Sequence, residues 1–156
     1  MQTQWGISSV GRAFEWHSKG QRFDSAMLHK MIQIGIKGHQ ETVVSENMLA
    51  SNVGSGLVKV YATAMMIALI EKAAVLSVEP YLEPGQGTVG TLVNVTHCSA
   101  TPLGMKVHAE TELVEIDRRR LVFKVAAYDE RGLIGEGMHE RFIIDNAKFQ
   151  AKADSK

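Results

Sequence analysis

Several features that define whole classes of protein are scarce or missing in this chain of 156 residues. It contains one cysteine, Cys98, so no internal disulfide can form and no zinc site can be built on cysteine spacing. Lysine and arginine together number 17, as do aspartate and glutamate, and the resulting zero net charge removes the usual electrostatic basis for binding nucleic acid. These absences predict a cytoplasmic protein whose partner is a small molecule or another protein.

No apolar run is long enough to cross a bilayer. The strongest one, residues 64–78, spans roughly 22 Å as a helix against the ~30 Å of a hydrocarbon core, and Glu71 and Lys72 interrupt it. The N-terminal stretch lacks the charged, apolar and small-residue segments of a secretory signal. With 45% hydrophobic and 22% charged residues, the composition is that of a single globular domain with no membrane partner.

Residues 1–30 differ from the rest of the chain. They hold both tryptophans and show neither the period of a strand nor that of a helix. Within them, residues 6–25 resemble the product of a transfer-RNA gene translated as protein, which predicts a true start at Met27 or Met31. A genuine but irregular extension is the alternative. We therefore expect three parts: a non-domain segment over 1–30, one domain over 31–146 and a flexible tail over 147–156.

The order of apolar patterns predicts one long helix among strands. Residues 41–49 have the pattern of a first strand, and residues 64–78 that of a helix with Thr63 as its N-cap. Four β-rich runs follow at residues 87–96, 105–116, 121–128 and 133–144. Short connections join antiparallel neighbours, so the fold class is α+β: one curved antiparallel sheet wrapped around a long central helix.

A single sheet on one helix leaves sheet edges uncovered, so we expect self-association. The arrangement resembles the hot-dog fold. Three segments are similar, in order, to the fluoroacetyl-CoA thioesterase-like branch of the hot-dog thioesterases: residues 61–74 (YATAMMIALIEKAA), 87–97 (GTVGTLVNVTH) and 135–142 (GEGMHERF). The resemblance implies an acyl-CoA thioesterase that forms a homodimer or higher homo-oligomer, with Thr63, Glu71 and His97 as catalytic residues at the interface.

Each of these three residues has a functional and a structural interpretation. The neighbours of Glu71 on its helix face are all apolar, which suits a general base or a histidine-orienting acid; a side chain reaching water past the sheet rim is the alternative. Thr63 either caps the helix or places its hydroxyl beside amides that stabilise an oxyanion. His97 is a solvated strand-end histidine or, by the resemblance, the general acid and base.

The spacing of two of these residues limits how they act. Thr63 and Glu71 are eight positions apart on one helix, roughly 12 Å of axial rise, which is too far for a hydrogen bond. Either His97 or the substrate bridges this gap, or one member comes from a second subunit. We predict the second arrangement, because a twofold contact between helices brings each Glu71 towards the other Thr63.

Two further residues are candidates for substrate binding. Gly90 allows close approach of the acyl group, or only a bulge in its strand. Arg141 shares a strand face with His139, and this pair either contacts a coenzyme A phosphate or a partner subunit, or lies on a solvated outer face. The opposite face of that strand, with Ile134, Met138, Phe142 and Ile144, is expected to meet the helix.

The predicted reaction is hydrolysis of a short-chain acyl-CoA to the free acid and coenzyme A, with no metal or other cofactor. Thr63, or a water that it holds, attacks the thioester carbonyl, His97 moves the proton, and Glu71 orients or charges the histidine. Two alternatives stay open, because fold alone does not choose between them: a non-catalytic acyl-CoA-binding protein, and a hot-dog enoyl-CoA hydratase or dehydratase.

Overall fold

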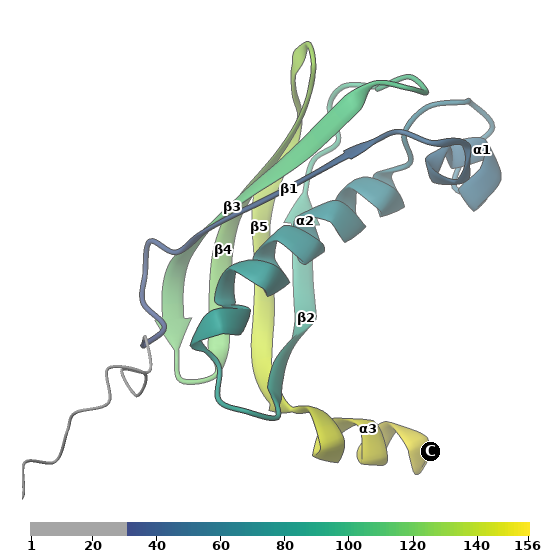
Figure 1. Ribbon diagram of the computed structural model, residues 1–156. Helices are drawn as coiled ribbons and strands as arrows, with labels where there is room; N and C mark the ends of the chain where they lie inside the picture. The colour runs from purple at the N-terminus through teal and green to yellow at the C-terminus, as the bar shows by residue number, and fades with distance from the viewer. Residues whose placement is uncertain (1–30) are drawn as a thin grey trace, which may run out of the picture.

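The computed structural model describes residues 31–156, so the predictions for residues 1–30 lie outside the described residues. In chain order the elements are β1 (Lys37–Val43), η2 (Glu46–Met48), α1 (Ala50–Val53), α2 (Thr63–Val78), η3 (Glu79–Tyr81), β2 (Gln86–Val95), β3 (Lys106–Asp117), β4 (Arg120–Asp129), β5 (Gly132–Asp145) and α3 (Asn146–Asp154). A curved sheet holds the long helix α2 along one face (Figure 1), which confirms the predicted α+β class.

The sheet has five antiparallel strands in the order β1-β3-β4-β5-β2. Strands β3, β4 and β5 form the predicted meander through two short turns, whereas β2 pairs with β5 and not with β3. The connection from Thr96 to Met105 is too long for a tight hairpin and carries the chain away from its neighbour in sequence. The expectation that each late strand pairs with the next one in sequence is therefore wrong for β2 and β3.

The first strand begins earlier than the sequence pattern predicted. β1 pairs with β3 from Lys37 opposite Glu112 to Val43 opposite Lys106. Residues 46–49, assigned to the strand by their apolar content, lie instead in η2 and at the start of α1. Local hydrogen bonds favour this turn, since Asn52 Nδ2 donates to the carbonyl of Glu46 over 2.6 Å.

Helix α2 supplies the centre of the core. Its fully buried residues are Met66, Leu69, Ile70, Ala73, Ala74 and Val78. They pack against inward-facing residues of β3 and β4 such as Leu113 and Phe123, both with no exposed surface. Burying a side chain of this size contributes about 1.5–3 kcal/mol, so this contact supplies much of the driving force for the fold.

The two faces of β5 are opposite to those expected near its C-terminal half. Met138 and Phe142 are 36% and 39% exposed, whereas His139 and Arg141 are buried on the side of α2. Ile134 is buried as predicted, because the register of β4 against β5 shifts between Ala127 and Tyr128. Alternation read from apolar residues alone fails here, since the inner face accepts polar side chains that bond to one another.

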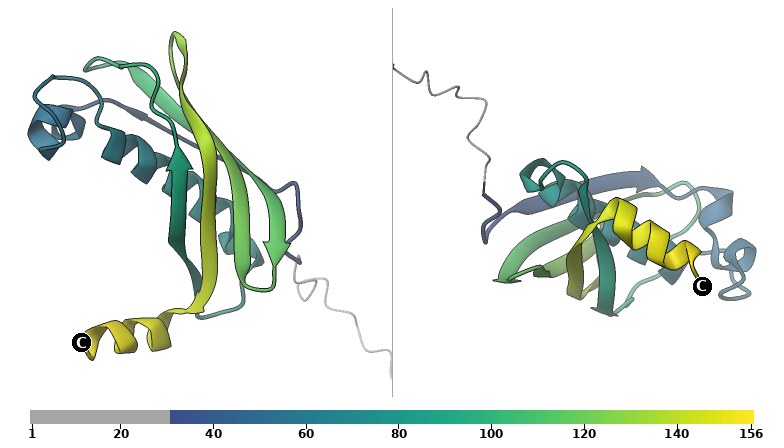
Figure 2. Two further views of the ribbon diagram at one scale, coloured as in Figure 1. Left: turned by 180° about the vertical axis from the view of Figure 1, so that it is seen from behind. Right: turned by 90° about the horizontal axis from the view of Figure 1, so that it is seen from below.

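Helix α3 extends the chain beyond the end of β5 and leaves the body of the sheet (Figure 2). Asp145 caps it by accepting a hydrogen bond from the backbone amide of Lys148 over 2.9 Å, and none of its residues is buried. The sequence predicted a frayed turn or a flexible tail here. The structure forms a helix, and its flexibility stays a prediction.

The close packing of α2 on β1 can be tested at Gly38. A Cβ at this position would lie 2.3 Å from the carbonyl oxygen of Ala73 and 2.5 Å from Thr111 Oγ1, so Gly38→Ala forces the helix from the strand. We expect a loss of about 1–3 kcal/mol in unfolding free energy, read as a lower urea midpoint. Gly56→Ala is the control, because its Cβ meets only Ala50 Cβ at 3.4 Å. Equal stability of the two variants would contradict this packing.

Candidate active site

Thr63 begins α2, and its hydroxyl faces His97, which lies two residues after the end of β2. The N-cap of the helix is Ala62, and no side chain caps it. Thr63 Oγ1 lies 2.7 Å from Nδ1 of His97. The prediction that Thr63 is the N-cap is therefore wrong by one residue, because its hydroxyl bonds an imidazole and not a backbone amide. The predicted proximity of Thr63 and His97 is present within one chain.

The imidazole of His97 is half-buried, and its two nitrogens have different surroundings. Nδ1 bonds Thr63, whereas Nε2 is buried without a hydrogen-bond partner among residues 31–156. Desolvation lowers the pKa of His97 below its ordinary value, and the nearby backbone of Ser99 opposes this shift. A neutral imidazole beside a hydroxyl is the arrangement in which histidine takes a proton from a nucleophile.

The first turn of α2 offers donors next to this pair. The amides of Met65 and Met66 both bond back to the carbonyl of Ala62, at 3.0 Å each. Within the described part of the chain, the amides of Thr63 and Ala64 make no hydrogen bond, so they point to the helix start unpaired. Amides in this position, at the positive end of the helix dipole, are suited to an oxyanion.

A cavity of about 380 Å³ opens beside Thr63 and His97. Its lining combines the start of α2 with the connection after β2: Ala50, Ser55, Val60, Tyr61, Thr63, His97, Cys98, Ser99 and Ala100. Tyr61 is buried in its wall and donates its hydroxyl to the carbonyl of Met65 over 3.1 Å. The volume lies within the range of small-molecule sites. Cys98 is exposed at this cavity.

A second polar cluster lies two turns further along α2, around Arg141 of β5. Arg141 is 5% exposed, and it donates from Nε to Thr88 Oγ1 and from Nη2 to the Thr88 carbonyl, both over 2.8 Å. Its Nη1 lies 3.2 Å from His139 Nε2 and 3.8 Å from Glu71 Oε1. Burial lowers the pKa of Arg141, and the charge of Glu71 opposes this shift. The interpretation of Arg141 as a solvated outer residue is wrong.

Glu71 lies directly over Gly90 of β2. A Cβ at Gly90 would be 2.5 Å from Glu71 Oε1, 3.2 Å from His139 Cε1 and 3.4 Å from Arg141 Nη1. The pairing of β2 with β5 is irregular between Gly90 and Leu92, as one of the two interpretations of this glycine predicted. The absence of a side chain at Gly90 thus lets the Glu71 carboxylate approach β2 closely. Contact of Gly90 with an acyl group stays a prediction.

One chain holds the predicted catalytic residues in two separate groups. Thr63 and His97 form one pair, whereas Glu71 lies with Arg141. No hydrogen bond or ion pair joins Glu71 to either member of that pair within residues 31–156; for Thr63 the spacing on α2 predicted this. Sequence reasoning missed Thr88, and it named His139 without its role. The alternation of His139 and Arg141 on one strand face was the available signal.

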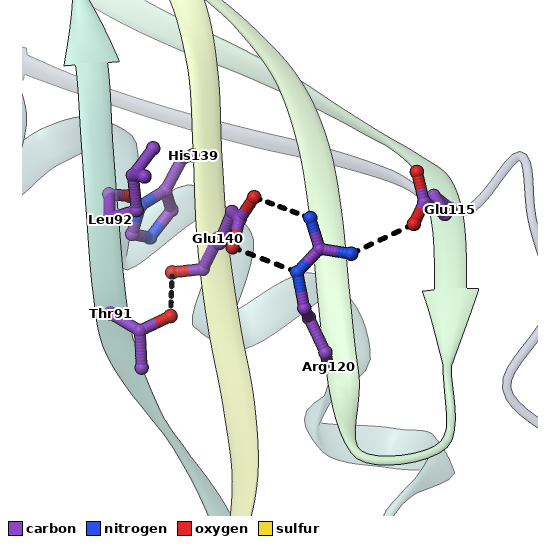
Figure 3. Close-up of polar contacts among 6 residues, drawn as sticks. All are labelled: Thr91, Leu92, Glu115, Arg120, His139 and Glu140. Carbon is purple, nitrogen blue, oxygen red and sulfur yellow. Dashed lines mark hydrogen bonds and ion pairs between the residues drawn. The ribbon is translucent and has the colours of Figure 1, made fainter.

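The other charged clusters of the described region lie on the outer face. Arg120 donates two hydrogen bonds of 2.6 and 2.9 Å to Glu140 and one of 2.8 Å to Glu115 (Figure 3). These carboxylates raise the pKa of Arg120, and the hydrogen bonds from Arg120 lower the pKa of Glu140. A cavity of about 550 Å³ also lies outside, over β1, β3 and β4, far from Thr63 in the fold.

Residues 31–156 contain neither a membrane-spanning helix nor a cluster of metal ligands. No helix there has the length and apolar content to span a membrane. No group of three or more histidine, cysteine, aspartate or glutamate side chains in that range is arranged to hold a metal ion.

The chain is similar to proteins of one family over most of its length. The model of the fluoroacetyl-CoA-specific thioesterase family, FlK, matches residues 44–147. The fluoroacetyl-CoA thioesterase of Streptantibioticus cattleyicolor is 46% identical over 98 residues, which cover 63% of this chain and 70% of that protein.

Solved structures agree with this match. The fluoroacetyl-CoA thioesterase FlK superimposes with a TM-score of 0.77 at 37% identity, covering 80% of this chain and 97% of that one. A hot-dog-like protein from Thermanaerovibrio acidaminovorans shares the fold at 20% identity, with a TM-score of 0.72 over 80% of this chain and 92% of its own. The chain therefore belongs to the fluoroacetyl-CoA-specific thioesterase family and is an acyl-CoA thioester hydrolase of the hot-dog fold.

Proposed function

We propose that the protein hydrolyses short-chain acyl-CoA thioesters at a site shared between two copies of the chain. The observation that carries the proposal is the 2.7 Å contact between Thr63 Oγ1 and His97 Nδ1 at the unpaired amides of α2. A nucleophile, a base and oxyanion donors in one place are what attack on a thioester carbonyl requires. The cavity of about 380 Å³ beside them supports a small acyl group.

In the proposed reaction the Thr63 hydroxyl, or a water bound to it, loses its proton to His97 as its oxygen attacks the thioester carbonyl. The amides of Thr63 and Ala64 hold the oxyanion that forms. Collapse of this intermediate breaks the carbon–sulfur bond, and His97 returns the proton to the sulfur of coenzyme A. On the covalent route, water then hydrolyses the acyl-Thr63 ester with His97 as base again; on the direct route, the acid forms in one step.

Glu71 enters the proposed site from the second copy. When the Thr63 hydroxyl donates to Nδ1, the proton of neutral His97 resides on Nε2, a buried donor that has no acceptor among residues 31–156. An unsatisfied buried donor costs about 1–3 kcal/mol, so an acceptor there is strongly favoured. The carboxylate of Glu71, whose side chain is 39% exposed, is the acid that the family resemblance assigns to this histidine.

The edge of β2 supports the proposed dimer. Within residues 31–156, β2 pairs with β5 alone, and residues 90–94 along it are exposed, including Leu92 at 45% and Val93 at 39%. Long apolar edge strands pair with other chains unless they are covered. Antiparallel pairing of two β2 strands about a twofold axis would bring Gly90 and Glu71 of one copy towards the β2 end, and hence His97, of the other.

Release of free coenzyme A from a panel of acyl-CoAs tests the activity. We expect the parent protein to favour short acyl groups and Thr63→Ala or His97→Ala to lower kcat by at least about 100-fold, because each removes a group that acts in the transition state. Thr42→Ala and His39→Ala are matched controls on β1 and should retain activity. No release from any acyl-CoA would refute hydrolysis, and hydration of an enoyl-CoA in its place would indicate a hydratase.

Heterodimers test whether the site is shared. A heterodimer of Thr63→Ala and Glu71→Gln subunits, isolated by two affinity tags, should recover about half of the parent activity, because one of its two sites then has no substitution. The pair Thr63→Ala with His97→Ala is the control and should stay inactive, since both residues act from the same chain. Absence of recovery in the first heterodimer would place Glu71 in its own subunit's site or outside it.

A pH profile tests the contact between Glu71 and His97. Within one chain desolvation lowers the pKa of His97, and an adjacent carboxylate would raise it. Activity requires neutral His97, so kcat/KM rises with pH through this pKa. We expect Glu71→Gln to move the midpoint of the acid limb of the residual activity to lower pH. An unchanged midpoint would show that Glu71 does not face His97 in the assembled protein.

A further inference from the structure

We propose that His139 is a positioning residue of this reaction: as a neutral imidazole it holds Arg141, and through Arg141 it sets the place of the Glu71 carboxylate. The inference rests on the proposed function, in which Glu71 faces the histidine of a second copy. Among the described residues, His139 makes no hydrogen bond with Thr63 or His97; its partners are Leu92 and Arg141.

His139 is fully buried in the middle of β5, on the face that meets α2. Its ring stacks on Phe123 of β4, with ring centroids 6.3 Å apart. An imidazole in such a place needs a partner for each nitrogen. Nδ1 lies 2.8 Å from the carbonyl oxygen of Leu92, and Nε2 lies 3.2 Å from Arg141 Nη1.

These two partners determine the tautomer of His139. The carbonyl of Leu92 can only accept, so Nδ1 carries the proton; Nε2 is then the bare nitrogen that accepts from Arg141. The irregularity of β2 after Gly90 lies directly before Leu92, whose carbonyl bonds this ring (Figure 3 shows His139 against Leu92). Desolvation and then the charge of Arg141 lower the pKa of His139, against the Leu92 bond and the charges of Glu71 and Glu140.

With His139 neutral, each of the three nitrogens of Arg141 has a hydrogen-bond partner. Thr88 takes Nε and Nη2, and His139 accepts from Nη1, so the remaining direction of Nη1 is towards Glu71 Oε1 at 3.8 Å. The side chain of Arg141 is 6% exposed and that of Glu71 is 39% exposed, so the guanidinium is the fixed member of the pair and the carboxylate the adjustable one. A base misplaced by about 1 Å can cost about 100-fold in rate.

Two amide substitutions separate the two bonds of His139. The side chain of Gln reaches the position of Nε2 and keeps an acceptor for Arg141, whereas that of Asn reaches only the position of Nδ1 and keeps the donor to Leu92. We expect His139→Gln to retain most of the parent kcat and His139→Asn to lose about 100-fold, both with KM near the parent value. His108→Asn on the outer face of β3 is the matched control. Equal kcat of the two His139 variants, with both folded by circular dichroism, would overturn the proposal.

A double-mutant cycle with Glu71 tests the route of the effect. If His139 acts through Arg141 on Glu71, His139→Asn has little further effect on kcat in a Glu71→Gln background. Losses that multiply in the double variant would show that His139 acts on another part of the protein, as a merely structural residue would. Thermal unfolding of all four proteins separates either result from a loss of folded enzyme.

Nitrogen-15 NMR of the imidazoles tests the arrangement without turnover. We expect His139 of the parent protein to titrate below the ordinary histidine value, with the proton of the neutral ring on Nδ1 and with hindered rotation of the Arg141 guanidinium that is lost in His139→Asn. A neutral ring protonated on Nε2, or free rotation in the parent, would overturn the proposal. If no acyl-CoA is hydrolysed, the proposed function fails while this measurement still decides the placement of Arg141.

Discussion

Helix α2 approaches the concave face of the sheet so closely that three positions leave no room for a side chain. A Cβ at Gly38 would meet the backbone of α2. One at Gly135 would lie 2.9 Å from the side chain of Met66 and still nearer to the carbonyl of Thr96, and one at Gly90 would meet Glu71. The first two contacts belong to the apolar core. The third is polar, and it places a carboxylate of the helix on the backbone of an edge strand. The close packing of α2 on the sheet therefore stabilises the fold and also positions Glu71 of the candidate site.

A buried arginine in this interface is stable only because its donors are occupied. Removing a charged group from water costs several kcal/mol unless hydrogen bonds and an opposite charge replace the solvent. Thr88 and His139 supply the neutral partners of Arg141, and Glu71 supplies the charge. The cost of burial also explains why the inner face of β5 is polar where its alternation suggested an apolar one. The polar cluster and the Thr63–His97 pair then lie at separate points along α2, which is what a site completed by a second copy requires.

Local patterns predicted most elements and little of their assembly. The long helix, the late strands and the antiparallel α+β class followed from apolar spacing and turn residues, because these signals come from neighbours in the sequence. The end of β1 was misplaced because Ser45 and Asn52 favour a turn inside the stretch predicted as a strand. The catalytic assignment came from a family resemblance, since isolated threonine, glutamate and histidine residues are compatible with capping and solvated roles.

The sequence by itself determined the order of elements, the identity of α2 and the impossibility of direct contact between Thr63 and Glu71, because helix rise depends only on residue spacing. Only the tertiary structure decided which side chains meet. His97 reaches Thr63 across 34 positions, and Arg141 reaches Thr88 across 53, because β2 pairs with β5 at one edge of the sheet. No periodicity in the sequence predicts that pairing, because it depends on the free energy of the whole sheet closing around the helix. The same packing of the sheet around the helix determines which face of β5 is buried. On that face, hydrogen bonds between polar groups outweigh the preference predicted from the apolar alternation.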